Sequence, residues 1–152
     1  MASGVPFTII APAYFMENLW NPWNLPVLAA GRFPSSVPPA RRVQQIAVDD
    51  VVRFAAHVLD HRDVFVGQRI EVASDELNAL EAAQIVSELT GSRLEVDGKV
   101  NGGPLPLFSW LDRVGYAIDV EALRRRFPEI AWRRFEEWAR SQEWSIVTSQ
   151  AG

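Results

Sequence analysis

The first residues of this chain with a chemical role to consider are its two tyrosines, Tyr14 and Tyr116, whose phenol groups could act as acids. A tyrosine acid is commonly assisted by a lysine four residues later, which lowers the pKa of the phenol. At that spacing Tyr14 is followed by Asn18 and Tyr116 by Val120. Lys99 is the only lysine of the chain, so the pair cannot form locally. The sequence therefore argues against a self-contained hydride-transfer enzyme.

A glycine-rich turn that could hold a dinucleotide is also missing from the sequence. Only main chain without Cβ atoms approaches a pyrophosphate closely enough for the amides of a helix N-terminus to bind it. None of the nine glycines forms such a motif. The nearest candidate is GKVNGG at residues 98–103, which no strong strand precedes and no helix follows. We interpret this segment as a loop.

Three polar clusters could bind a metal or a phosphate, or act as an acid–base pair. His57 and His61 are four residues apart, a spacing that can bind a metal on a helix, but the helix is predicted to end before His61. We therefore expect solvent-exposed histidines and no metal. The carboxylates at 49–50 are expected to cap a helix and favour its first turn. The arginines at 124–126 are expected to form a solvated helix end rather than a phosphate site.

The composition is that of an ordinary folded domain. The 152 residues, 48% hydrophobic and 22% charged, can form one domain with its own core, but they are too few for a complete two-part dinucleotide enzyme. The net charge of -4 argues against nucleic acid as a partner. The chain lacks cysteine, which excludes thiolate chemistry, and it has no apolar stretch long enough to span a bilayer. We expect a soluble cytoplasmic protein.

Strand-like and helix-like segments alternate along the chain, which predicts an α/β fold. The segment 7–10, FTII, has no alternating polar face, a pattern typical of a strand covered on both sides. Because this strand begins only a few residues after Met1, its neighbours must come from later in the chain or from elsewhere. Further strands are predicted at 43–48, 69–73 and 93–96, a short helix at 14–20, and loops at 21–42 and 97–108.

Apolar periodicity predicts a helix that begins after Asp49, its expected N-cap, and reaches about residue 59. Arg53 and His57 are expected to face solvent. The predicted buried stripe consists of Val51, Val52, Ala55, Val58 and Leu59.

Two later helices carry clear capping signals. Asn78 and Glu81 have the spacing of a capping box, and Gly91 is placed to end the same helix in a left-handed conformation. Asp119 is the expected N-cap of a further helix, which must end by Phe127 because Pro128 follows. A last helix is predicted around residues 135–138.

The segment from Ser3 to Asn18, SGVPFTIIAPAYFMEN, resembles the pattern SGVPxTxxRPxxFMEN of the NmrA-like family of atypical short-chain dehydrogenase/reductases. The likeness continues in family order through QIAVDDV at 45–51, GQRIEVASDEL at 67–77 and FEEW at 135–138. In that family the first segment lies midway along the protein, after the cofactor-binding portion. The resemblance therefore implies the C-terminal half: a partial Rossmann-like sheet edge plus a small α/β substrate domain, without the N-terminal nucleotide-binding half.

The same resemblance implies a link to NAD(P), since the family contains reductases, quinone-type oxidoreductases and redox-sensing regulators without turnover. NAD(P) is not expected to bind this chain alone. Ala11 stands where the family commonly has arginine, which puts any contact of that arginine in doubt. By resemblance, the residues bordering the nicotinamide are Pro12, Tyr14 and Phe15, and those lining the substrate side are Met16, Asn18, Trp20 and Trp23.

Three functions are compatible with these observations. The leading hypothesis is the substrate-side portion of an NmrA-like NAD(P)-dependent oxidoreductase or redox-sensing protein. A second is a non-catalytic binding module that depends on a partner, as a homo- or hetero-oligomer through an exposed sheet edge. A third is a cofactor-free lyase or isomerase that uses Tyr14, Glu17 or Asp50.

Overall fold

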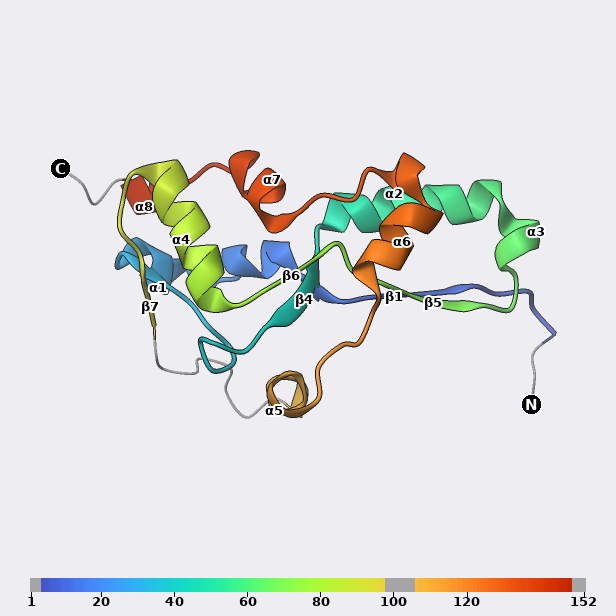
Figure 1. Ribbon diagram of the computed structural model, residues 1–152, viewed down its shortest axis with the longest axis horizontal. Helices are drawn as coiled ribbons and strands as arrows, with labels where there is room; N and C mark the ends of the chain where they lie inside the picture. The colour runs from blue at the N-terminus through green and yellow to red at the C-terminus, as the bar shows by residue number, and fades with distance from the viewer. Residues whose placement is uncertain (1–3, 98–105, 149–152) are drawn as a thin grey trace.

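The computed structural model describes residues 4–97 and 106–148 and shows an elongated α/β molecule (Figure 1). Its strands are β1 (Ile9–Pro12), β2 (Tyr14–Phe15), β3 (Arg32–Phe33), β4 (Val43–Ile46), β5 (Arg69–Val72), β6 (Asp75–Leu77) and β7 (Glu95–Val96). Its helices are α1 (Leu25–Ala29), α2 (Val48–Asp60), α3 (Arg62–Phe65), α4 (Ala79–Thr90), α5 (Pro106–Arg113), α6 (Val120–Arg126), α7 (Phe135–Arg140) and α8 (Ser145–Thr148), with the 3-10 turns η1 (Met16–Trp20) and η2 (Pro128–Ile130). Within these ranges no helix combines the length and apolarity needed to cross a membrane.

The described strands form three small sheets. β1 and β5 pair in parallel, and β3 pairs with β7 in parallel. In the middle sheet β2 and β4 are parallel, and β6 joins β4 in antiparallel orientation. The chain passes from the first sheet to the middle sheet at Ala13, between β1 and β2. The residues after Ala13 therefore leave the carboxyl end of β1 and enter the centre of the molecule.

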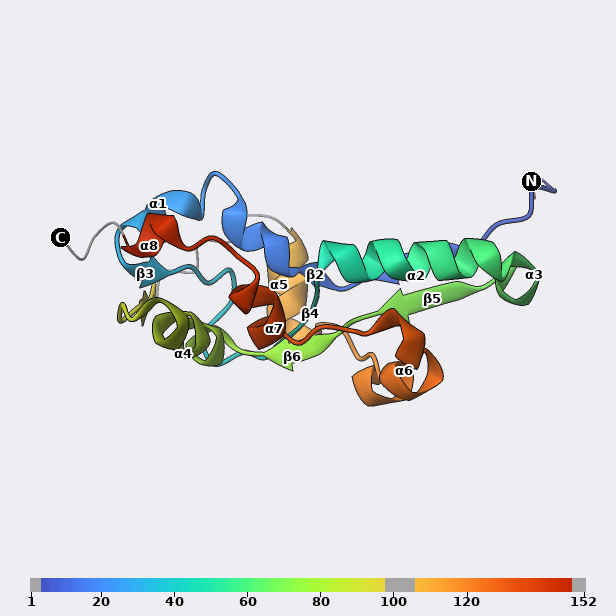
Figure 2. The same ribbon diagram turned by 90° about the horizontal axis from the view of Figure 1, so that it is seen from above.

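Two hydrophobic clusters hold the fold together. The first cluster lies around α4 and α7, and its larger members include Met16, Leu28, Phe33, Leu77, Val86, Phe135 and Trp138. The second lies between α2, the β1–β5 pair and α6, and includes Ala13, Ile46, Phe54, Val72, Phe127 and Trp132. In Figure 2 the elements of the two clusters lie toward opposite ends of the molecule, with α5 and the middle sheet between them.

Several predicted boundaries are wrong. Residues 14–20 contain β2 and η1 instead of one helix, and residues 21–42 contain α1 and β3 instead of a continuous loop. Pro26 is compatible with α1 because it lies in the first turn, where its missing N–H costs no helical hydrogen bond. The loop predicted at 97–108 ends by Pro106, where α5 begins, and residues 98–105 lie outside the described ranges.

The capping signals of α4 and α6 are confirmed. The Asn78 side chain accepts a hydrogen bond from the Glu81 N–H at 2.9 Å, and the Glu81 carboxylate accepts one from the Asn78 N–H at 2.8 Å. Gly91 ends α4 with a φ of 69°. Asp119 Oδ1 accepts the Ala122 N–H at 2.8 Å at the start of α6. These bonds depend only on residues close in sequence, which is why local spacing could predict them.

The expected cap of α2 is wrong. The N-cap residue is Ala47, which offers no side-chain acceptor, and Asp49 belongs to the first turn. Glu17 takes the capping role from a distant position, because its Oε1 accepts the Val48 N–H at 3.0 Å. The same oxygen accepts the Trp138 indole N–H at 3.0 Å. Through these two hydrogen bonds, Glu17 of η1 connects the start of α2 with α7.

The buried face of α2 also differs from the predicted one. Phe54 and Val58 point into the second cluster, whereas Val52 and Leu59 are 60% and 72% exposed. His57, expected to face solvent, lies on the buried side near the Phe54 ring. Apolar residues occur on both sides of α2, so periodicity could not show which side meets the sheet.

The β1–β5 pair is covered on one face only. In Figure 1, α2 and α6 lie on one side of the pair, and no described helix covers the other. Ile70 and Val72 of β5 point toward the covered side and are buried, while Phe7 and Ile9 are 57% and 43% exposed. The strand expected to be covered on both sides is therefore bare on one side within this chain.

One edge of β1 is free among the described residues. The N–H groups of Ile9 and Ala13 donate to β5 and its preceding residue, each at 2.9 Å. In a parallel ladder, alternate residues direct their backbone groups to the same edge. The backbone groups of Thr8 and Ile10 therefore point away from β5, toward an edge where no described strand pairs with them.

Candidate functional site

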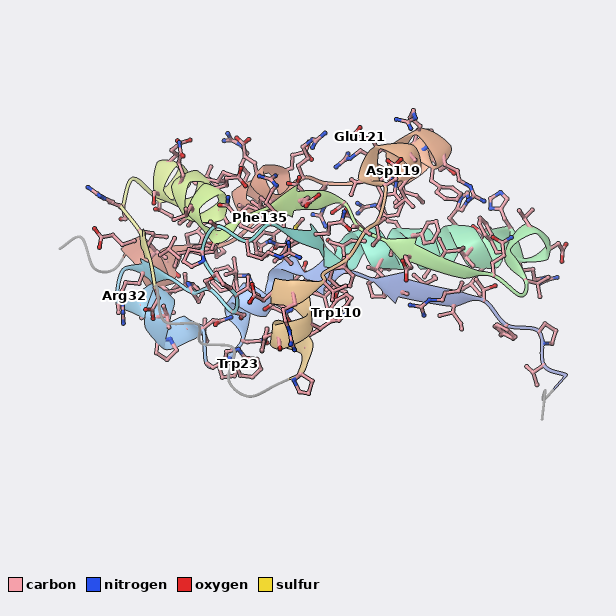
Figure 3. All side chains as sticks on the ribbon, turned by 60° about the horizontal axis from the view of Figure 1, so that its bottom comes forward. Trp23, Arg32, Trp110, Asp119, Glu121 and Phe135 are labelled. Atoms are coloured by element: carbon pink, nitrogen blue, oxygen red, sulfur yellow. The ribbon has the colours of Figure 1, made fainter. Side chains whose placement is uncertain are left out.

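A mostly apolar cavity lies between the middle sheet, residues 33–37, α4 and α5. The cavity has a volume of about 70 Å³ and is partly open to solvent. Its larger apolar lining residues are Met16, Leu19, Phe33, Val37, Val43, Leu77, Leu111 and Phe135. Its polar lining residues are Tyr14, Asn24, Ser35, Ser36, Arg41 and Gln45. Figure 3 shows Phe135 within the body of the molecule, where it closes one wall.

Tyr14 contributes a phenol group to this cavity. Burial raises the pKa of Tyr14 above its ordinary value of 10.0, and hydrogen bonds with the Ser36 and Asn18 side chains offset only part of this effect. The phenol is therefore neutral near pH 7 and can donate a hydrogen bond to a ligand oxygen. The pKa of Tyr116 is also raised, first by burial and then by the nearby Tyr14.

Arg41 joins the cavity wall to α5. Its Nε donates to the Leu111 carbonyl at 3.0 Å, and its Nη2 donates to the Val114 carbonyl at 2.8 Å. Gly115 follows with a φ of +75°, and a Cβ on it would lie 2.9 Å from Arg41 Nη2. The positive φ favours glycine here, and a Cβ would also require the flexible end of the Arg41 side chain to shift. Because Leu111 also lines the cavity, Arg41 fixes one of its walls.

The structure brings some of the residues assigned by resemblance to the cavity. Tyr14 and Met16 line it, and Asn18 bonds to the Tyr14 side chain without lining it. Pro12 ends β1, and Phe15 lies in β2 and packs against the second cluster. Both residues are close in sequence to Tyr14 and Met16, which line the cavity. Their role beside the nicotinamide stays a prediction.

The two tryptophans assigned to the substrate side do not line the cavity. The Trp20 indole donates to Gln142 Oε1 at 3.1 Å, and its ring centroid lies 4.9 Å from that of Trp144. Trp23 is 60% exposed. In Figure 3 it lies at the outer rim, on the same side as α5. A substrate role for either residue stays a prediction.

The neighbouring carboxylates Asp49 and Asp50 have different environments. Asp50 is 0% exposed; its Oδ1 accepts from Arg53 Nη2 at 2.6 Å and Arg133 Nε at 3.1 Å, and its Oδ2 accepts the Arg133 N–H at 2.8 Å. Asp49 accepts from Arg133 Nη2 at 3.0 Å. Burial lowers the pKa of Arg133, but the bonds and charges of both carboxylates outweigh it and raise that pKa. Asp50 thus ties α2 to the segment before α7.

The residues of the lyase alternative are not brought together. Of Tyr14, Glu17 and Asp50, only Tyr14 lines the cavity. The carboxylates of Glu17 and Asp50 accept the hydrogen bonds that cap α2 and join it to its neighbours. Both therefore have structural partners, while the second oxygen of Glu17, Oε2, is buried and accepts no hydrogen bond from the described residues.

The two histidines lie at the end of α2, away from the cavity. Their ring centroids are 4.3 Å apart, and His57 Nδ1 lies 3.3 Å from Glu129 Oε1. The expectation that both are exposed is wrong for His57, whose side chain is largely buried. In the part of the chain that the structure describes, no three histidine, aspartate or glutamate side chains are arranged to hold a metal.

The arginine run at the end of α6 is partly structural. Arg124 donates to the Trp132 carbonyl at 2.7 Å and the Ser74 carbonyl at 2.6 Å, so it anchors α6 to the rest of the fold. The Arg126 guanidinium lies 4.9 Å from the centroid of the Phe127 ring. Arg125 is exposed, as expected for a solvated helix end.

Sequence reasoning missed Ser36, Arg41 and Gln45. The available signal was the long proline-containing stretch 21–42, because loops of that length are usually functional. Part of this stretch forms part of the cavity wall. No rule based on residue spacing could have shown which of its residues face the cavity.

No described connection from a strand to a helix contains a glycine. Ala47 lies between β4 and α2, and Asn78 lies between β6 and α4. The glycine-containing segment 98–103 lies outside the described residues. These two connections therefore lack the glycine-containing main chain that binds a pyrophosphate.

No protein-family model matches the sequence, and a search of curated proteins finds no match. Solved structures do match. A nucleoside-diphosphate-sugar epimerase from Staphylococcus aureus has a TM-score of 0.63 at 16% identity, over 91% of this chain and 53% of that protein. The negative transcriptional regulator NmrA in complex with NADP has a TM-score of 0.63 at 18% identity, over 99% and 56%.

A third match is UDP-glucuronic acid 4-epimerase from Bacillus cereus in complex with UDP-glucuronic acid and NAD. Its TM-score is 0.64 at 9% identity, over 96% of this chain and 46% of that protein. The chain thus spans about half the length of the structures it matches. At these identities the likeness shows the fold alone, and it confirms the predicted α/β class.

Proposed function

We propose that this chain is the substrate-side unit of an NmrA-like NAD(P)-binding protein. Its cavity holds a small ligand, and a separate nucleotide-binding unit presents the nicotinamide beside Tyr14. Turnover of that ligand or redox sensing without turnover are both compatible with this arrangement. The proposal rests on the position of the cavity relative to the β1–β5 pair.

That position is the observation that carries the proposal. β1 ends at Pro12, and the cavity residues Tyr14 and Met16 follow directly. In open α/β sheets, ligands bind in the crevice outside the carboxyl ends of parallel strands. A phenol that stays protonated at this point can hydrogen-bond a carbonyl or hydroxyl group held in front of a nicotinamide.

The bare side of β1 and α2 supports a second unit as partner. Eight of the thirteen exposed large apolar residues of the described chain belong to β1, α2, α3 and their flanking segments: Val5, Phe7, Ile9, Val48, Val52, Leu59, Val64 and Val66. Such a concentration is unusual for a surface that only meets water. A parallel strand added at the free edge of β1 would extend the sheet and cover part of this surface. Two of the solved neighbours, each about twice as long as the matched part, carry NADP or NAD.

Binding studies on the isolated chain test this proposal. We expect no saturable binding of NADPH or NADH in a fluorescence titration. We also expect the neutral apolar probe 2-naphthamide to shift the amide NMR signals of Met16, Ser36 and Ala82. Ala79→Phe, which adds a ring to the cavity wall, should weaken the probe, and Leu80→Phe, on the exposed side of α4, should not. Stoichiometric NADPH binding by the chain alone, or shifts confined to other surfaces, would refute the proposal.

A further inference from the structure

Arg41 is the one charged side chain among the described residues that line the cavity. The other described lining residues are apolar or neutral, and none is acidic. A cation in an otherwise apolar wall attracts an anion more strongly than it would in bulk water, because the local dielectric constant is lower. The charge of the cavity is therefore complementary to an anionic group.

The charge of Arg41 is not compensated within the described chain. No described carboxylate forms an ion pair with it, whereas its neighbour Arg42 pairs with Glu81 at 2.6 Å. The two hydrogen bonds of Arg41 go to the neutral carbonyls of Leu111 and Val114. A guanidinium carries five N–H donors, so these bonds leave three for water or a ligand.

Arg41 is also held in place. Its two bonds to the end of α5 fix the guanidinium plane, and Gly115 leaves the space that Nη2 occupies. Arg41 and Leu111 line both the mostly apolar cavity and an adjoining polar hollow of about 110 Å³, which Arg42 and Glu76 also line. The guanidinium thus stands at the boundary between a mostly apolar cavity and a polar one.

From these observations we propose that the cavity selects a ligand with an apolar body and a single carboxylate, bound by Arg41. This inference rests on the proposed function, because it assigns the substrate class of the same site. A carboxylate matches the planar guanidinium and its single charge. A phosphate dianion would need further donors with positive charge; the second arginine of the adjoining hollow, Arg42, is already paired with Glu81.

Paired probes of equal shape test the inference. The carboxylate 2-naphthoate and the neutral 2-naphthamide are titrated into the whole chain near pH 7 by fluorescence or calorimetry. We expect 2-naphthoate to bind about tenfold more tightly or better, as for a charge-assisted bond in a partly buried site. In Arg41→Met the ratio of the two affinities should fall to about one. In Arg113→Met, which removes an exposed arginine of α5 that lines neither the cavity nor the adjoining hollow, the ratio should be unchanged.

The variant Arg41→Lys separates the effect of the positive charge from the effect of the hydrogen bonds to α5. Lysine keeps the positive charge but cannot make both bonds to α5, so it should retain a preference for 2-naphthoate. If Arg41→Met merely loosened α5, both probes would weaken together and their ratio would persist, which would overturn the inference. Equal affinities in the unaltered chain would overturn it and leave the proposed function intact. Failure of both probes to bind would overturn both.

Discussion

Asp50 has a fully buried carboxylate, whose two oxygens accept hydrogen bonds from Arg53 and Arg133. A buried ion pair adds little net stability, because desolvation offsets much of the attraction. Removal of one partner is different, since it leaves charge without compensation. The role of Asp50 at the residue scale is to hold α2 against the segment that leads into α7.

Replacing Asp50 with Ala should lower the free energy of unfolding by about 3 kcal/mol, because two arginines lose their partner. Urea denaturation followed by tryptophan fluorescence measures this change. Asp49→Ala is the matched control: its carboxylate is largely exposed and bonds to the same Arg133, so we expect a loss below about 1 kcal/mol. Small and equal losses in both variants would contradict the structural role of Asp50.

At the scale of the element, α2 has apolar residues on two sides. One side, with Phe54 and Val58, packs into the second cluster, and the other, with Val52 and Leu59, is exposed. A helix of this kind is suited to a position between two layers. In this chain only one of those layers is present among the described residues.

Two valines of α2 provide a matched comparison. Val58→Ser should cost about 2 to 3 kcal/mol of unfolding free energy, because it removes buried apolar contacts and buries a hydroxyl group. Val52→Ser makes the same chemical change on the exposed side and should stay within about 0.5 kcal/mol. Thermal and urea unfolding of the two variants measure the difference. Equal costs would show that Val52 is buried in solution.

The elements differ in how well their sequence predicted them. The caps at Asn78 and Asp119 could be predicted because each bond joins residues three apart. The cap of α2 could not, since Glu17 lies 31 residues from Val48. The sequence predicts a helix at 14–20, because periodicity contains no information on the pairing of β2 with β4, which depends on residues far along the chain.

The residues of the candidate site also differ in whether the sequence could predict them. Tyr14 and Met16 were found through the family resemblance of a continuous segment, which needs no knowledge of the fold. Arg41 could not be found in this way, because its contact with Leu111 spans 70 residues. Ser36 likewise meets Tyr14 only in the folded chain. Residues whose role depends on such distant contacts cannot be predicted from residue spacing.

At the scale of the whole molecule, one side of the fold is left open. The free edge of β1, the bare face of the β1–β5 pair and the exposed side of α2 are contributed by neighbouring elements. An open strand edge is a site where another chain can pair. Pairing with another strand at this edge remains a prediction of the proposed function.

Hydrogen exchange tests whether that edge is open in the isolated chain. The amides of Ile9 and Ala13 donate to β5 or the residue before it and should be protected. The Ile10 amide points to the free edge and should exchange about tenfold faster or more, because no partner must open first. Comparable protection at Ile10 in dilute solution would mean that the edge is covered and would contradict this picture.

The cavity wall shares many of its side chains with the first hydrophobic cluster. Met16, Phe33, Leu77 and Phe135 belong to both, whereas Ser36, Arg41 and Leu111 belong to the wall alone. A mutation in the shared set alters the packing of the first cluster, whereas Ser36 lies outside that cluster. Laboratory selection for new ligands is therefore expected to change Ser36 more readily than Met16, Phe33, Leu77 or Phe135.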